Sequence, residues 1–435
     1  MSSEPREGLS FTDQELLTTA THPDFRAWLN RIRRIGGCQD PVHLIGHTLT
    51  AEPGTGRLVG ALTSDSQPYG RLTIACGNRR LSRCEPCARL HQGDTYHLIA
   101  AGLAGGKGVT DAVRGHPRAF VTFTAPSFGA VHRGGPCNGA SKCRHGANCV
   151  VKHGEGDLLV GSPLCSHCYD YPAAVLFNAH TRDLWQRLHR NLYEDLATQQ
   201  GVSRTAMRKA VRLSYAKVAE WQRRGSVHFH AVMRFDGPAG PADPVPAWAT
   251  LGLLIRTVRS AAQRVTYNVP DTDVVLRFGS QLDIRPIAPG RAGEELTERA
   301  VASYIAKYVT KPEVSGVTVD RPIRDLTTVQ VLPVTEHSRK LIHTCWVLGL
   351  RRWAHQLGYR GHIATKSRRY STTYTALRAA RAEHRKGGEA PAADALVEKA
   401  WAFSHSGHTA GQAMFAEGIA DDLHEARQAA REERR

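Results

Sequence analysis

The sequence predicts an α+β protein in which strands and helices are mixed along one chain. Segments rich in β-branched and aromatic residues, typical of strands, lie at residues 119–124, 213–221, 226–235 and 280–286. Segments with apolar residues at helical spacing lie at residues 183–196, 251–265 and 294–310. Two of the strands are separated only by a short loop that contains glycine, which predicts an antiparallel hairpin.

The composition indicates a basic protein with a polyanionic partner. The chain has 435 residues, enough for two or three domains, with 57 Lys and Arg against 40 Asp and Glu. The net charge of +17 favours nucleic acid as the partner, ahead of a membrane. The sequence has no apolar run long enough for a membrane span, and its first residues do not resemble a signal peptide. We therefore expect a cytoplasmic protein whose clustered cysteines are reduced and bind metal.

Residues 1–100 are expected to form a helical lead-in followed by a cysteine-rich zinc knuckle. Helical spacing occurs at residues 11–17 and 25–35. The candidate zinc ligands, which include one CxxC pair, are Cys38, Cys76, Cys84 and Cys87. Four thiolates can close a tetrahedral zinc site, although a CxxC pair without metal is the alternative.

Residues 102–110 resemble a phosphate-binding loop but do not satisfy the motif. Only three residues separate Gly102 from Gly106, and Gly108 follows Lys107 where Ser or Thr is required. Because no other segment fits the motif, we expect no ATPase or helicase motor in the chain.

A second cysteine-rich segment, at about residues 137–168, offers more ligands than one zinc ion needs. The candidates are Cys137, Cys143, His145, Cys149, His153, Cys165 and Cys168. We expect a structural zinc on Cys143, Cys149, Cys165 and Cys168, with His145 or His153 as substitutes.

The predicted hairpin brings three metal-ligand types to one face. Alternate side chains of a strand share a face, so His228 and His230 point the same way. A three-residue loop at 223–225, with Gly225 in the left-handed conformation, sets Gln222 opposite Ser226 and Glu220 opposite His228. Two imidazoles and a carboxylate with open positions form a divalent-metal site. Packed or surface histidines are the alternative reading of an H-x-H pair.

The helix predicted at residues 294–310 carries Tyr304 and Tyr308, four residues apart and so on one face. Each tyrosine has a lysine three residues later, Lys307 and Lys311. A cation one turn away favours a phenolate or a phosphotyrosine. Half-buried packing is the alternative role of such a pair.

The C-terminal part, residues 326–435, is expected to be basic, mainly helical and in contact with DNA. Residues 351–386 mix basic and aromatic side chains, which suits contact with the DNA backbone and base stacking, although a solvated helix face is the alternative. Residues 395–435 are predicted as two helices. The basic residues expected to contact DNA, here and elsewhere, are Arg223, Arg224, Lys311, Lys366, Arg368 and Arg369.

A metal site, tyrosines on a helix and a basic surface together suit cleavage of DNA. A metal can polarise a scissile phosphate while a tyrosine oxygen attacks it, leaving a 5′-phosphotyrosine link and a free 3′-OH. Because the phosphoester energy is retained, the reaction can run backwards onto another strand end.

The chain resembles the HUH superfamily of rolling-circle replication initiators. More closely, it resembles the actinobacterial initiators of conjugative plasmids and integrative elements. The three motifs that carry the resemblance are residues 120–132, Glu220 with Arg224-Gly225 and His228-Phe229-His230, and residues 304–311. Further likeness lies at Cys84–Cys87, at Cys165–Tyr171, at Gly361-His362 and at residues 366–371, and the resemblance spans residues 36–375.

The resemblance implies a central antiparallel sheet flanked by helices, at residues 101–325, with zinc-binding insertions outside the minimal core. It implies Mg or Mn on His228, His230 and Glu220, Tyr308 as the main nucleophile, Tyr304 as a second or auxiliary one, and Lys307 as an aid at the phosphate. The implied partners are single-stranded and duplex origin DNA, and a host helicase and polymerase.

Two alternatives share parts of this pattern. A transposase or a conjugative relaxase would use the same chemistry. A non-catalytic, zinc-dependent DNA-binding regulator would bind the origin without forming a covalent adduct.

Overall fold

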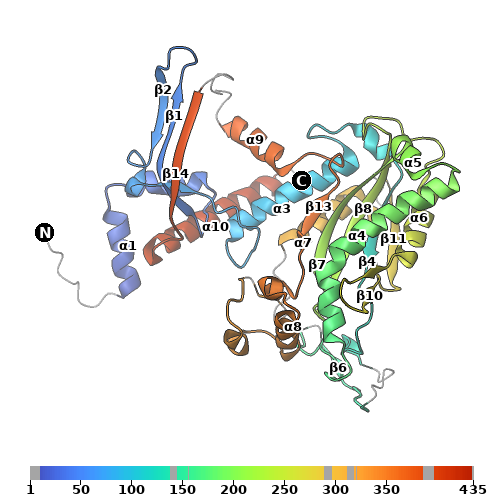
Figure 1. Cartoon of the computed structure of the whole chain (residues 1–435). Coiled ribbons are helices and arrows are strands. Elements are labelled where there is room, and N and C mark those ends of the chain that lie inside the picture. Colours follow the sequence, from blue (N-terminus) through green and yellow to red (C-terminus); the bar gives the residue numbers. More distant parts are fainter. Residues whose placement is uncertain are drawn as a thin grey trace. The chain divides into compact units, whose positions relative to one another are not determined.

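The computed structural model describes residues 10–137, 145–154, 156–288, 296–310, 318–319, 321–385 and 396–433 (Figure 1). The chain forms two compact units, one of Met1–Asp94 with Thr375–Arg435 and one of Thr95–Tyr374. This division differs from the three consecutive regions expected at 1–100, 101–325 and 326–435, mainly in the place of the C-terminal residues. The C-terminal residues pair with the N-terminal ones, and such long-range pairing has no local sign in the sequence.

The unit Thr95–Tyr374 is built on a six-stranded sheet that confirms the expected antiparallel architecture. Its strands, in spatial order, are β12 (Leu296–Thr297), β11 (Leu282–Ala288), β4 (Arg118–Phe123), β8 (Val227–Asp236), β7 (Arg212–Trp221) and β13 (Ala364–Lys366). Every neighbouring pair is antiparallel except β11 and β12. The H-x-H strand β8 lies in the middle, where both of its edges are paired.

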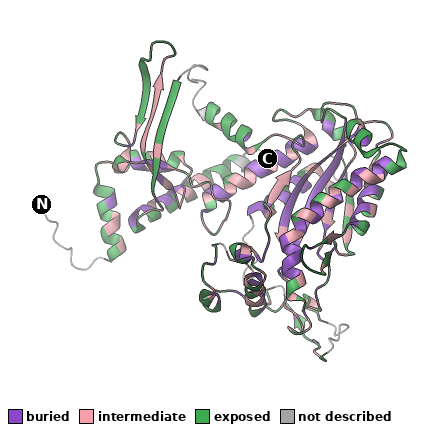
Figure 2. Ribbon diagram, viewed as in Figure 1, coloured by how far each residue is buried: buried purple, intermediate pink, exposed green. Residues whose placement is uncertain are grey.

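Helices α4 (Tyr171–Gln199) and α6 (Leu251–Arg264) cover one face of this sheet. Trp185 of α4 meets Phe123 and Phe229 edge-on, with ring centroids 5.5 and 5.6 Å apart. Figure 2 shows β7 and β8 largely buried. Helix α4 begins twelve residues before the predicted start, because Asp170 caps its first turn by accepting a hydrogen bond from Ala173 N.

Helix α7 (Glu298–Thr310) lies on the opposite face, which is the face of the two histidines. Its first residue, Glu298, accepts a hydrogen bond and ion pair from the buried Arg118 of β4. Arg118 also donates to the carbonyl oxygens of Leu103 and Ile287. A strand residue therefore holds the start of the tyrosine helix against the sheet.

The other unit has its own sheet, in the order β14 (Leu396–Ser406), β1 (Val42–Ala51), β2 (Leu58–Thr63), with β3 (Leu72–Ile74) also paired to β1. This unit also contains α1 (Phe11–Thr21), α2 (Phe25–Arg34), η1 (Pro68–Gly70) and α10 (Ala410–Glu432), together with nearly all of α9 (Tyr374–Arg385) and the first part of α3 (Glu85–Ala104). Its buried apolar core contains Trp28, Ile32, Ala416 and Ile419.

Two helices were predicted after residue 395, and the first of these predictions is wrong. Residues 396–406 form strand β14, which is antiparallel to β1 from Val42↔Ser406 to Ala51↔Leu396. Gly46 makes the close pairing possible, since a Cβ there would lie 1.9 Å from the carbonyl oxygen of Ala400. A partner strand some 350 residues away overrides the local helical tendency of this segment.

The further elements complete the described chain. They are η2 (Asp111–Gly115), β5 (Gly135–Pro136), β6 (Lys152–His153), α5 (Arg204–Ala210), β9 (Tyr267–Asn268), β10 (Val275–Leu276), η3 (Thr327–Val331), α8 (Glu336–Val347) and η4 (Arg351–Gln356). Within the described ranges, no helix has both the length and the apolar character needed to cross a membrane.

Candidate active site

The β7–β8 hairpin has the register that the sequence predicts. Glu220 pairs with His228 and Trp221 with Val227. Gln222 N donates to Ser226 O at 2.9 Å, and Gly225 has a φ of +75°. The left-handed conformation at Gly225 therefore places the carboxylate and the two imidazoles on one face.

Asn178 of α4 fixes the turn of this hairpin, and it was not among the residues predicted from the sequence. Its side chain is fully buried, donates to Gly225 O at 2.8 Å and Leu357 O at 2.9 Å, and accepts from Val227 N at 2.9 Å. A buried amide with all these partners stabilises one arrangement strongly. The only available sign was a polar residue on the apolar face of a helix.

The three predicted metal ligands form a compact group. The Oε2 atom of Glu220 lies 2.9 Å from Nε2 of His228 and 3.0 Å from Nε2 of His230. One candidate ligand atom from each residue lies within 4.8 Å of the others. The Oγ1 atom of Thr122 lies 3.1 Å from Nδ1 of His230, which leaves Nε2 facing the carboxylate. This donor set fits a divalent cation.

Both tyrosines of α7 contact this group. The hydroxyl of Tyr304 lies 3.4 Å from Nε2 of His230, and the Tyr308 ring centroid lies 5.4 Å from that of His230. Burial raises the pKa of Tyr304, and the neighbouring Tyr308 and Glu220 add to that rise. Lys307 is exposed between the tyrosines, and Lys311 lies outside the described residues.

The six residues expected to contact DNA differ in what their side chains do. Arg224 turns inward and donates to Gln222 Oε1 and to the carbonyl oxygens of Ala125 and Pro126, each at 2.8 Å. Burial also lowers the pKa of Arg224. Its guanidinium therefore braces the turn. Because Arg224 also lines a groove beside that turn, its contact with DNA stays a prediction.

Lys366 also has hydrogen-bond partners within the chain, so its contact with DNA stays a prediction as well. Its ammonium donates to the carbonyl oxygens of Ser367, Arg368 and Ser371 at 3.1–3.4 Å, which closes its own loop. Arg223, Arg368 and Arg369 are exposed. The Arg369 guanidinium donates to the carbonyl oxygen of Ala239.

A groove of about 980 Å³ lies beside the hairpin turn, at the end of β4. Its lining includes four arginines, Arg133, Arg223, Arg224 and Arg277, together with Phe278. Guanidinium groups and an aromatic ring suit a polyanion that also carries flat bases.

Comparison with known proteins decides the family. The profile of the family described as "Replication initiator protein, pSAM2" matches residues 24–421. A replication initiator protein of Streptomyces ambofaciens is 44% identical over 441 aligned residues, which cover 96% of this chain and 95% of that protein. This chain belongs to the replication initiator family. No solved structure matches it.

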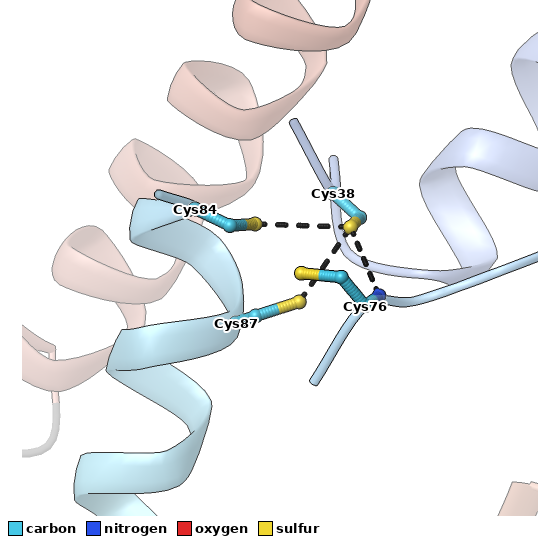
Figure 3. A group of neighbouring side chains, drawn as sticks. All are labelled: Cys38, Cys76, Cys84 and Cys87. Carbon is cyan, nitrogen blue, oxygen red and sulfur yellow. Dashed lines mark hydrogen bonds between the residues drawn. The ribbon is translucent and has the colours of Figure 1, made fainter. Parts of the chain in front are cut away.

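The first cysteine group of this initiator comes together as predicted (Figure 3). The Sγ atom of Cys38 lies 3.7 Å from that of Cys84 and 3.6 Å from that of Cys87, and Cys76 N donates to it at 3.3 Å. All four are free thiols. Tetrahedral bonds of about 2.3 Å to zinc place neighbouring sulfurs about 3.8 Å apart, so the spacing fits that metal.

The second cysteine-rich segment is arranged differently from the prediction. His132, Cys137, Cys149 and His153 form one group, and His145, Cys165 and Cys168 form another. The expected single group that joins Cys149 to Cys165 and Cys168 is therefore wrong, because β5 and β6 pair and carry Cys149 away from the CxxC pair. Cys143 lies outside the described residues.

Proposed function

We propose that this initiator starts rolling-circle replication by nicking single-stranded origin DNA with a tyrosine, as in the HUH superfamily. The observation that carries the proposal is the contact between the tyrosine helix and the candidate metal group. The Tyr308 ring centroid lies 5.4 Å from that of His230. The Tyr304 hydroxyl lies 3.4 Å from the His230 nitrogen, which itself lies 3.0 Å from Glu220. A candidate nucleophile that touches a group able to hold a cation favours a protein that cleaves DNA by phosphoryl transfer over one that only binds DNA.

Glu220, His228 and His230 would hold the catalytic cation, Mg or Mn. When bound there, it would polarise the scissile phosphate and offset negative charge in the transition state. The hydrogen bond between His230 Nδ1 and Thr122 Oγ1 supports this role. A metal-ligating histidine typically has its ring oriented by a hydrogen bond from its other nitrogen, which leaves Nε2 for the cation.

In the proposed step, Tyr308 gives up its phenolic proton and its oxygen forms a bond to the scissile phosphorus. The bond from phosphorus to the 3′ oxygen breaks. That oxygen takes up a proton from solvent, which balances the proton that Tyr308 releases to solvent, and it leaves as a 3′-OH that can prime synthesis. The 5′ phosphate remains on the tyrosine, so the reverse attack by a 3′-OH rejoins strands. The resemblance, rather than a difference between the two phenols, assigns Tyr308 as the main nucleophile and Tyr304 as a second or auxiliary one. Lys307 would assist at the phosphate.

The DNA partner is proposed from charge. The net charge of +17 and the arginines of the groove suit the phosphate backbone of single-stranded and duplex origin DNA. Exposed Arg223, Arg368 and Arg369 add to that surface, and Lys311 stays a candidate from the sequence. Strand separation and synthesis would come from a host helicase and polymerase, since the sequence has no phosphate-loop motor.

We also assign a structural zinc to Cys38, Cys76, Cys84 and Cys87. The sulfur spacing of 3.6–3.7 Å supports this assignment, as does the burial of three of the four thiols. Cys165 and Cys168, with His145, form a second candidate metal group.

The nicking activity predicts a covalent DNA–protein adduct. The purified chain is mixed with Mn²⁺ or Mg²⁺ and single-stranded oligonucleotides that tile the replicon encoding it, and products are resolved on a denaturing gel. We expect one oligonucleotide to give an adduct that requires the added cation. Tyr308→Phe should lower adduct formation at least about 100-fold, because the attacking oxygen is removed.

Tyr267→Phe is the matched control, because Tyr267 packs on His180 away from the metal group. Full adduct formation by Tyr308→Phe would contradict the choice of nucleophile. Origin binding with no adduct from any oligonucleotide would instead favour the zinc-dependent regulator. A transposase or relaxase would give the adduct but would not support plasmid maintenance.

A further inference from the structure

We propose that His132, Cys137, Cys149 and His153 bind a structural zinc ion that holds one wall of the arginine-lined groove. This site is separate from the Cys38 group and from the candidate catalytic cation. The zinc assignment does not depend on the nicking activity, and only the identity of the groove's ligand as DNA rests on the proposed function.

The four side chains have the spacing of a tetrahedral site. His132 Nδ1 lies 3.1 Å from His153 Nε2, and Cys149 Sγ lies 3.2 Å from the same nitrogen. All four ligand atoms lie within 4.8 Å of one another. Tetrahedral bonds of about 2.0–2.3 Å place neighbouring ligand atoms about 3.3–3.8 Å apart, so the group needs little adjustment.

The chemistry of the donors selects zinc. Two thiols and two imidazoles form a closed set typical of structural zinc sites. Cys137, Cys149 and His153 are buried, with exposed fractions of 6%, 7% and 3%. A buried, closed set of soft and borderline ligands disfavours Mg and Ca, which prefer oxygen ligands.

An outer carboxylate gives an independent indication of a metal. Asp157 Oδ2 lies 2.5 Å from His153 Nδ1, while Leu159 N donates to Asp157 Oδ1 at 2.8 Å. Metal-bound histidines usually donate their second ring N–H to a carboxylate in this way, which fixes the tautomer. Here it directs His153 Nε2 toward the other three ligands.

The segment around this group needs such a link. Its secondary structure in the described residues is the two-residue pairing of β5 with β6 and an isolated bridge between Val131 and Pro163, with a hydrogen bond from Cys137 N to Val151 O. Val150 and Leu158 are 84% and 69% exposed. A segment that leaves its large apolar side chains in solvent buries too little apolar surface to stabilise its own fold. A bound metal supplies the missing stability.

This zinc-bound segment lines the groove. His132, Arg133, Val160 and Gly161 face the same space as the hairpin turn. Arg223 donates to Asp157 O at 3.0 Å, and a Cβ added at Gly161 would lie 2.6 Å from the Arg223 backbone. Zinc would therefore hold Arg133 in the lining of the groove that Arg223 also lines, where both cations suit the phosphates of a DNA strand.

The zinc content of the full chain tests the site. Metal is measured by mass spectrometry after purification without chelator. Cys149→Ala should lower the bound zinc by one equivalent relative to the wild-type chain. Cys345→Ala is the matched control, because Cys345 is a buried free cysteine outside the three cysteine-containing groups, and it should leave the zinc content unchanged. Unchanged zinc content in Cys149→Ala would overturn the proposal.

A second measurement covers the case in which Cys149→Ala does not fold. Asp157→Asn leaves all four ligands in place, and it should speed the loss of one zinc equivalent to a chelator about 10-fold or more. Asp183→Asn is the control, since Asp183 lies 3.0 Å from His180 on α4, outside these groups. Equal release rates in Asp157→Asn and Asp183→Asn would overturn the proposal.

Discussion

Single residues decide where the chemistry of this initiator can take place. Glu220 reaches both histidines because Gly225 adopts a left-handed conformation, and Asn178 ties that turn to α4. A two-residue loop would shift the register by one and turn Glu220 to the other face. One glycine and one buried amide therefore fix the geometry of three candidate ligands.

On the other face of the same sheet, Lys217 is buried without a carboxylate partner among its described contacts. Its ammonium lies 3.8 Å from the Phe229 ring centroid and 5.2 Å from that of Trp185. Burial lowers the pKa of Lys217 from 10.5 to about 7. Attraction to the rings, worth about 2 kcal/mol at most, opposes this shift only in part.

Lys217→Met is expected to be more stable than the wild-type chain at pH 7. The unfolded chain keeps the Lys217 proton up to about pH 10.5, whereas the folded chain loses it near pH 7, so wild-type stability rises across that window. The advantage of the variant should therefore shrink, by up to about 1.4 kcal/mol per pH unit, as pH rises from 7 to 10.5. Urea unfolding across this range measures it, with exposed Lys209→Met as the control. A constant difference between variant and wild type would contradict the prediction.

At the scale of elements, the tyrosine helix depends on one buried ion pair for its position. Arg118 of β4 has a side chain that is 1% exposed, and it pairs with Glu298 at the start of α7. Two turns later the same helix presents Tyr304 and Tyr308 to His230. The strand that lies beside the histidines therefore also aligns the two tyrosines.

Arg118→Met is expected to destabilise the chain by about 3 kcal/mol and to lower adduct formation, because it leaves Glu298 and three carbonyl oxygens without their donor. Chemical denaturation and the adduct gel measure the two effects. The matched control is Arg190→Met, whose ion pair with Glu194 is exposed and should contribute less than about 1 kcal/mol. Equal unfolding midpoints for the two variants would refute the role of Arg118.

At the scale of the whole molecule, the first and last parts of the chain form one unit. Strand β14 pairs with β1 along its length, and Ala416 and Ile419 of α10 complete the core around Trp28 and Ile32. His408 Nε2 lies 2.9 Å from the carbonyl oxygen of Cys38, so the C-terminal segment also supports the first cysteine group.

A chain that ends at Arg385 is expected to lose the fold of this unit and keep the other. It would lack β14 and α10, and β1 would then have an open edge and an incomplete core. In the described chain, the six-stranded sheet uses no strand after β13, which ends at Lys366. Hydrogen exchange should show fast exchange in β1 and unchanged protection in β4 and β8. Protection of β1 equal to that of the full chain would contradict this expectation.

The sequence by itself determined the local features on which the candidate site depends. The alternation of His228 and His230, the Gly225 turn and the tyrosine spacing on α7 all act within a few residues, so their geometry follows from strand and helix periods. The CxxC pair of Cys84 and Cys87 can be predicted from the sequence for the same reason, because its two cysteines are only three residues apart.

Only the tertiary structure decided which distant segments meet. The pairing of β14 with β1, the partition of the second cysteine-rich segment, and the inward turn of Arg224 depend on contacts between residues far apart in the chain. Burial of apolar surface and satisfaction of hydrogen bonds over the whole unit determine which of these contacts form. No periodic pattern in the sequence indicates them. His132 and Cys137 therefore joined Cys149 and His153 only once the chain was folded.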